Sequence, residues 1–122
     1  MPHPPESVIA ALNLLSELEG RRVAVLGDML ELGSYEEIGH RLVGRRAADV
    51  AQVLVTVGRR ARLIAEEARD AGLDPAAVIE LDDSQQVLEL LRDLISPGDV
   101  VLLKGSRGMR LDRLVPALEV RP

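Results

Sequence analysis

The amino-acid sequence predicts an α/β fold: a Rossmann-like, open and mainly parallel sheet of about four to five strands, with helices on both faces. The first observation is a set of short apolar runs that are typical of buried strands, at residues 22–27, 53–57, 78–81 and 100–104. The second is that a helical pattern lies between each run and the next. Crossovers of this kind are right-handed and place successive strands parallel to one another.

The first helix is expected to begin at Pro4 and Pro5, because proline is favoured at the start of a helix. Apolar residues then recur at helical spacing until Gly20, namely Val8, Leu12, Leu15 and Leu18. No strand precedes this helix in the sequence. We therefore expect either that the helix caps the sheet or that a preceding strand lies outside this chain.

A second helix is expected after the loop at 28–33. Ser34 could cap it, with Glu37 as the capping-box partner three residues later. The helix should run to about Val50. Its apolar face is expected to contain Ile38, Leu42 and Val43.

The later elements follow the same alternation. A charged helix at 59–71 should end at Gly72, with its charges forming a solvated face of i,i+4 pairs. Asp83 or Ser84 should cap the next helix, and a turn is expected at 96–99. A short last helix is expected at 111–118. The apolar stripe of the helix before the turn is Val87, Leu88, Leu91 and Ile95.

Composition restricts the class of protein. The 122 residues are enough for one domain with its own core. Tyr35 is the only aromatic residue and the net charge is −5, which argues against a nucleic-acid-binding protein. There is no cysteine, and no apolar run approaches the roughly 20 residues that cross a membrane. We expect no nucleic-acid partner and no membrane insertion.

The only lysine, Lys104, lies where the last apolar run meets a glycine-spaced basic loop. The loop continues with Gly105, Ser106, Arg107 and Gly108. Open α/β folds bind ligands at the carboxyl edge of the sheet, so this loop is a candidate anion site. A solvated turn explains the same residues equally well.

Asp28 directly follows the first buried strand and is expected at the same edge. Its carboxylate could accept hydrogen bonds from a ligand amine or hydroxyl, cap a loop, or pair with an arginine. Glu31, in the same loop, could pair with Arg107 or be solvated. His40 lies within a helical pattern and, taken alone, indicates a packing or surface residue.

Several kinds of chemistry lack their motifs. The sequence has no Walker A phosphate loop and no dinucleotide-binding glycine fingerprint after its first strand. No histidine pair has metal-ligand spacing, and no catalytic triad can be assembled. Helix capping explains the pair Asp82–Asp83 better than a magnesium site does. We therefore expect no catalytic or metal-binding residue in this chain.

Two segments, taken together, resemble the C-terminal domain of the Mur ligases. The first is V-A-V-L-G-D-M-L-E-L-G at 23–33, followed by H-R-L-V-G at 40–44. The second is G-D-V-V-L-L-K-G-S-R-G-M-R-L-D at 98–112, and P-E-S-V-x-A-A-L at 5–12 is similar to the stretch that opens the family's first helix. We expect residues 1–122 to form one such domain. We expect its first strand to be missing; Pro2 and Pro4 stand where the family has asparagines.

The resemblance implies part of a cytoplasmic, ATP-dependent ligase of peptidoglycan synthesis, in the branch that adds D-alanyl-D-alanine to UDP-N-acetylmuramoyl-tripeptide. In such an enzyme the substrate carboxylate is activated as an acyl phosphate, which the dipeptide amine then attacks. ATP and Mg²⁺ are held mainly by a central domain; like the N-terminal domain, it is absent from this chain. The C-terminal domain would act as a lid that excludes water and positions the nucleophile. We expect the chain alone to be inactive and to bind no cofactor tightly.

The resemblance also implies roles for the basic loop. Lys104 and Arg107 would stabilise phosphate or carboxylate. Gly105 and Gly108 would let backbone N–H groups approach the anion, and Ser106 would donate a hydrogen bond.

The resemblance assigns the loop after the first strand to the amine substrate. Asp28, together with Met29, Leu30 and Glu31, would shape that side of the site. His40 matches a family position and would act by orienting its neighbours.

Three other classes of function share features with this sequence. A stand-alone Rossmann-like binder of anionic nucleotides or sugar phosphates has the same fold, and nucleotide binding by the chain alone would favour it. A non-enzymatic interaction module would expose apolar surface and self-associate. A receiver-like signalling domain is disfavoured, because the second strand ends in Thr56, Val57 and Gly58 without an acceptor aspartate.

Overall fold

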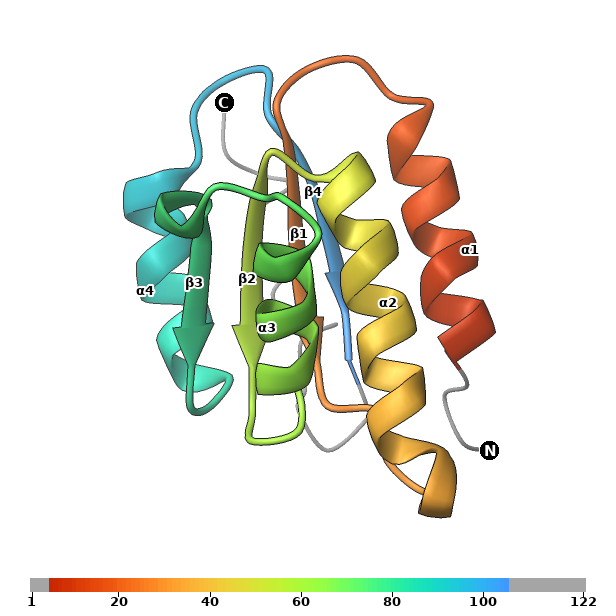
Figure 1. Ribbon diagram of the computed structural model, residues 1–122. Helices are drawn as coiled ribbons and strands as arrows, with labels where there is room; N and C mark the ends of the chain where they lie inside the picture. Colours follow the sequence, from red (N-terminus) through yellow and green to blue (C-terminus); the bar gives the residue numbers. More distant parts are fainter. Residues whose placement is uncertain (1–4, 106–122) are drawn as a thin grey trace.

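A computed structural model describes residues 5–105, whose strands form one parallel sheet in the order β3–β2–β1–β4 (Figure 1). The strands are β1 (Arg22–Gly27), β2 (Val53–Val57), β3 (Val78–Leu81) and β4 (Val100–Lys104). All four coincide with the predicted apolar runs. The predicted Rossmann-like parallel sheet is therefore confirmed.

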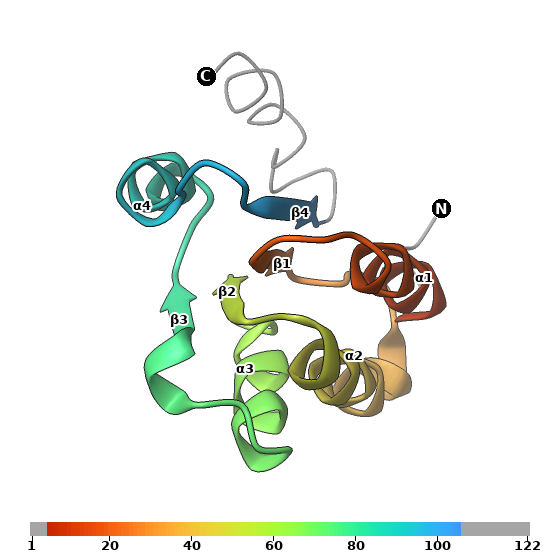
Figure 2. The same cartoon turned by 90° about the horizontal axis from the view of Figure 1, so that it is seen from above.

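Helices lie on both faces of this sheet, as predicted. Figure 2 shows α1, α2 and α3 on one face and α4 on the other. None of the helices in residues 5–105 combines the length and the apolar character needed to cross a membrane. The predicted helix at 111–118 lies outside the described residues. The helical elements are α1 (Pro5–Ser16), the 3-10 turn η1 (Gly33–Tyr35), α2 (Glu36–Val50), α3 (Arg62–Asp70), the 3-10 turn η2 (Pro75–Ala77) and α4 (Gln85–Leu94).

Alternate strand residues face the two helix layers. Ala24 and Leu26 of β1 pack with the layer of α1, α2 and α3. Val23 and Val25 belong to the second core cluster, on the side of α4. Burial on both faces explains why β1 and β2 are continuous apolar runs. The strand β4 is half-buried rather than fully buried, because it lies at one edge of the described sheet.

The buried face of α2 differs from the predicted one. Ile38 and Leu42 are 55% and 43% exposed, so the prediction that they face the core is wrong. Small residues let α2 approach its neighbours instead; a Cβ atom on Gly44 would collide with the backbone carbonyl of Ile64 in α3. The buried residues of α2 are Gly39, His40, Val43, Gly44, Ala47 and Val50.

Two predictions about the ends of α1 and α2 are also wrong. The helix α1 ends at Ser16, so Leu18 lies beyond it and is exposed. Ser34 lies within η1, and α2 begins directly from that turn without a side-chain cap. The backbone N–H of Glu36 donates to the carbonyl of Gly33, which satisfies a first-turn donor without help from Ser34.

The cap of α4 agrees with the sequence. The Asp83 carboxylate accepts a hydrogen bond from the backbone N–H of Gln85 at 2.9 Å. The side-chain oxygen of Gln86 accepts from the backbone N–H groups of Asp82 and Asp83. The Asp83 carboxylate therefore caps the helix start, whereas the Asp82 carboxylate pairs with Arg62. Residues 5–105 contain no group of three or more side chains arranged to hold a metal ion.

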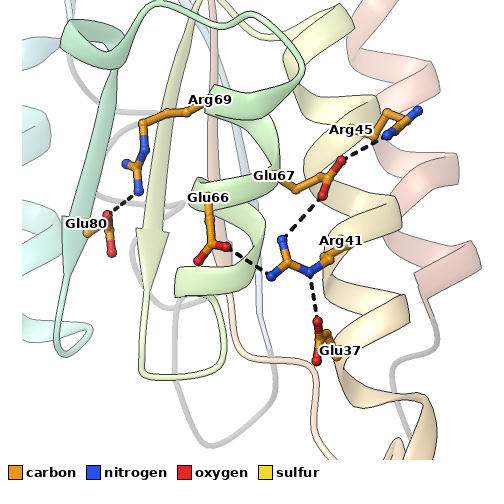
Figure 3. Close-up of polar contacts among 7 residues, drawn as sticks. All are labelled: Glu37, Arg41, Arg45, Glu66, Glu67, Arg69 and Glu80. Atoms are coloured by element: carbon orange, nitrogen blue, oxygen red, sulfur yellow. Dashed lines mark hydrogen bonds and ion pairs between the residues drawn. The ribbon is translucent and has the colours of Figure 1, made fainter.

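The charges of α3 pair with other elements rather than within the helix. The Glu67 carboxylate of α3 pairs with two arginines of α2, and these ion pairs join the two helices (Figure 3). The hydrogen bond from Arg45 is the main cause that lowers the pKa of Glu67. The pairs in this view are Arg41 with Glu37, Glu66 and Glu67, Arg45 with Glu67, and Arg69 with Glu80.

Candidate functional site

The carboxyl ends of the strands meet at one edge of the sheet, at the bottom of Figure 1. Leu26 of β1 pairs with Lys104 of β4 on one side and with Thr56 of β2 on the other. The three strands therefore end almost level. As a result, Asp28 and the loop after β1 lie between the loops that follow β2 and β4.

A small hollow at this edge, about the size of one water molecule, is lined by the ends of β1 and β4 together with residues of α1 and α3. Four of the predicted site residues take part in its wall. The hollow is far too small for a nucleotide, so a nucleotide could meet this wall only from outside. The lining residues are Val8, Leu26, Gly27, Asp28, Met29, Ile64, Lys104 and Gly105.

The Asp28 carboxylate is buried and is engaged within the protein. One oxygen accepts a hydrogen bond from the backbone N–H of Ala61 at 2.8 Å. The other lies 3.6 Å from the Arg60 guanidinium. Of the roles that the sequence left open for Asp28, the structure contains both loop capping and arginine pairing.

His40 is fully buried and joins α2 to the loop after β1. The backbone N–H of Met29 donates to its Nε2 at 3.1 Å, and its Nδ1 lies 2.7 Å from the carbonyl oxygen of Glu36. A backbone N–H can only donate and a carbonyl can only accept, so Nδ1 carries the proton and the ring is neutral. His40 lies behind Met29 rather than in the wall of the hollow.

Arg60 closes these contacts into a ring. Its guanidinium donates to the Glu36 carboxylate at 2.8 Å while lying beside Asp28. The hydrogen bond to Glu36 is the main cause that raises the pKa of Arg60. The order of the ring is Asp28, Arg60, Glu36, His40 and Met29, and it returns to Asp28 along the chain.

The sequence interpretation missed Arg60 and Glu36. One signal could have pointed to Arg60: it follows Gly58 at the end of β2, and parallel strands bring their carboxyl ends together. Glu36 carries no comparable signal, because its position depends on the η1 turn, which the capping pattern did not predict.

The remaining predicted residues are less fixed by contacts. Leu30 is half-buried, whereas Glu31 is exposed and has a φ of +64°, in the left-handed region. Lys104 is half-buried and makes no ion pair with any residue from 5 to 105. Ser106, Arg107 and Gly108 lie outside the described residues, so the pairing of Glu31 with Arg107 stays a prediction.

This fold is shared with a known family of ligases. The chain belongs to the Mur ligase family, because the family model described as the Mur ligase, glutamate ligase domain, matches residues 2–107. The match confirms the resemblance carried by the two signature segments.

Named relatives narrow the likeness within the family. The UDP-N-acetylmuramoyl-tripeptide–D-alanyl-D-alanine ligase of Bacillus subtilis (strain 168) is 36% identical over 121 residues, which cover 97% of this chain and 26% of that protein. The ligase of the same name from Escherichia coli (strain K12) is 36% identical over 117 residues, covering 93% and 24%. The chain therefore spans about a quarter of the length of these relatives.

Solved structures agree with the sequence relatives. A crystal structure of MurF from Acinetobacter baumannii matches with a TM-score of 0.79 at 30% identity, over 98% of this chain and 26% of that one. MurF ligase from Thermotoga maritima, solved in complex with ADP, matches with a TM-score of 0.73 at 25% identity, over 94% and 25%.

Proposed function

We propose that this chain is the lid domain of an ATP-dependent ligase that joins D-alanyl-D-alanine to UDP-N-acetylmuramoyl-tripeptide. One observation carries the proposal. Asp28–Met29 and Lys104–Gly105 come from the two family signature segments, and they line the same hollow at the carboxyl edge. That edge belongs to a chain about a quarter as long as the ligases it resembles, so it would meet a substrate held largely by other domains.

The residues present fit an edge contact with an anion rather than a complete cofactor site. The Lys104 amine carries a positive charge, and it adjoins the flexible backbone of Gly105 at the end of β4. Residues 5–105 contain no metal-binding cluster. The family resemblance implies that the Mg²⁺ ligands belong to the central domain. ATP would supply the phosphoryl group that activates the substrate carboxylate.

Closure of the domain would have two physical effects. It would exclude water from the acyl phosphate, which water would otherwise hydrolyse. It would also hold the dipeptide amine near the activated carbon, which replaces an entropically costly encounter with a prearranged one. The ring of Asp28, Arg60, Glu36, His40 and Met29 would keep the edge rigid during closure.

The partners in this proposal are the N-terminal domain, the central domain and both substrates. The reaction would take place in the cytoplasm, where ATP is available.

The test is the Lys104→Ala variant of the full-length ligase, assayed by phosphate release with ATP, UDP-N-acetylmuramoyl-tripeptide and D-alanyl-D-alanine. We expect kcat to fall about 100-fold, the usual cost of removing one group that stabilises a developing anion. Arg92→Ala is the control, because Arg92 is exposed on α4. Unchanged turnover in Lys104→Ala would show that Lys104 is not part of the site. If the unmodified ligase forms no amide product, the proposed function is overturned.

A further inference from the structure

The outward face of α2 changes character along the helix. Near its start, Tyr35, Ile38 and Leu42 are 40%, 55% and 43% exposed. Ile38 and Leu42, four residues apart, lie on one side of α2, and Tyr35 is the last residue of η1, directly before the helix. Farther along, the same side carries the exposed charges Arg45 and Asp49. We call the apolar part the α2 stripe (Tyr35, Ile38 and Leu42). It is confined to the start of α2, which lies near the carboxyl edge of the sheet (Figure 1).

Packing among residues 5–105 does not cover the α2 stripe. The helix already packs through its opposite side, where small residues meet α1 and α3. The polar groups that flank the stripe are bonded: Arg41 to acids of α2 and α3, and Arg46 to Asn13 of α1 at 2.8 Å. Exposed apolar side chains with a polar rim mark interaction surfaces.

We infer that the α2 stripe docks this domain onto the central domain of the same ligase polypeptide when the lid closes. This inference rests on the proposed function. In the proposed ligase, this chain accounts for about a quarter of the length of its relatives, so the central domain is available as a partner on the same polypeptide. The stripe is also continuous with the candidate site, because the loop from Asp28 runs through η1 directly into α2. The start of α2 lies at the same end of the molecule as the carboxyl edge (Figure 1), so one partner domain that covers this end can contact both.

The size of the α2 stripe favours a tethered partner over a second copy of the chain. Stable dimers bury about 800 Å² on each partner, which is far more than three half-exposed side chains offer. A domain on the same polypeptide has an effective concentration in the millimolar range, so a small contact suffices. A small contact also releases readily, as a lid that opens in every cycle requires.

The first arm of the test compares two variants of the full-length ligase. Ile38→Ser combined with Leu42→Ser removes most of the α2 stripe. Leu14→Ser is the matched control, because Leu14 is 68% exposed but lies on α1. We expect kcat/KM to fall about tenfold in the double variant, as for the loss of a typical interface anchor, and to stay unchanged in the control. Equal kinetics in both variants would overturn the inference.

The second arm does not depend on turnover. Hydroxyl-radical footprinting of Tyr35 should show strong protection in the full-length ligase with ATP and UDP-N-acetylmuramoyl-tripeptide, compared with the 122-residue chain. Equal labelling would overturn the docking. If the full-length ligase makes no amide, the proposed function fails, and the labelling still reports on the contact.

The third arm uses the 122-residue chain to exclude the other occupants. We expect the double variant to melt only a few degrees below the unmodified chain, the cost of serine's weaker helix propensity, because the α2 stripe is exposed there. A much larger fall in the melting temperature would assign the stripe to the chain's own termini. A dimer that the double variant dissociates would assign it to a second copy. Either result would overturn the inference.

Discussion

Gly58 leaves the space that the Asp28 carboxylate occupies. A Cβ atom at this position would lie 2.5 Å from one carboxylate oxygen of Asp28. The φ of Gly58 is +109°, a conformation that other residues adopt only with strain. The glycine thus permits the hydrogen bond from Ala61 to Asp28, which fixes the loop after β2 against the end of β1.

Gly58→Ala should therefore destabilise the fold through two separate effects. Backbone strain costs about 1–3 kcal/mol, and the collision with Asp28 adds about 1–3 kcal/mol. Gly72→Ala is the matched control, because Gly72 has a φ of +111° but nothing lies within 4 Å of its added Cβ. Urea unfolding of the 122-residue chain measures both variants. Equal losses of unfolding free energy would mean that the Asp28 carboxylate moves aside at no cost.

Single residues of the site differ in how far the sequence could predict them. Asp28 and Lys104 share an edge because Asp28 directly follows β1, Lys104 ends β4, and these neighbouring parallel strands end together. The orienting role of His40 comes only from the family resemblance; its partners could not be predicted, since they are backbone groups of Met29 and Glu36. Hydrogen bonds to backbone groups cannot be predicted from residue types, because almost every residue carries the same backbone donor and acceptor.

Whole elements show the same division. The strands are predictable because burial on both faces demands an unbroken apolar run. The orientation of α2 is not predictable from hydrophobicity, because Gly39 and Gly44 contribute close approach rather than apolar bulk. The apolar residues of the α2 stripe form the same sequence pattern as a core face would. The prediction of packing is wrong here because this apolar surface is the one that we assign to a partner.

Arg21 and Asp99 tie together the segments that lead into β1 and β4. The Arg21 guanidinium donates to the Asp99 carboxylate at 2.7 Å and to the carbonyl of Leu94 at 2.6 Å. The same carboxylate accepts from the backbone N–H of Ser96, and its side chain is only 6% exposed. The hydrogen bond from Arg21, followed by that from Ser96, lowers the pKa of Asp99.

This lowered pKa predicts a loss of stability in acid. A carboxylate whose pKa is lower in the folded state stabilises the fold fully above its unfolded pKa of about 4. That contribution disappears as the pH falls from there through the folded pKa. Asp99→Asn should therefore be less stable at pH 7 and lose less stability between pH 5 and pH 3. Urea unfolding across this range, with exposed Asp93→Asn as control, tests it; parallel curves for Asp99→Asn and the unmodified chain would contradict it.

At the scale of the molecule, the carboxyl edge combines a ring of bonded side chains with a hollow too small for a nucleotide. Glu36 and Arg60 link the start of α2 to the loop after β2, and Asp28 links that loop to β1. The hollow beside them holds no more than about one water molecule. A rigid wall with a small hollow suits a surface that completes a site formed elsewhere. It does not suit a pocket that binds a nucleotide alone.

The 122-residue chain should therefore bind ATP with a Kd above about 1 mM, which corresponds to a binding free energy weaker than about −4 kcal/mol. The described part of the chain has neither a phosphate loop nor a metal-binding cluster, and Lys104 alone gives little affinity in water. Titration calorimetry of the chain with ATP and Mg²⁺ measures this directly, with the full-length ligase as the positive control. Micromolar binding by the chain would favour the stand-alone nucleotide binder instead. Loss of that binding in Lys104→Ala would then place the nucleotide at the hollow. The residues of the carboxyl edge would in that case be explained as a nucleotide site of the chain alone, without a closing lid.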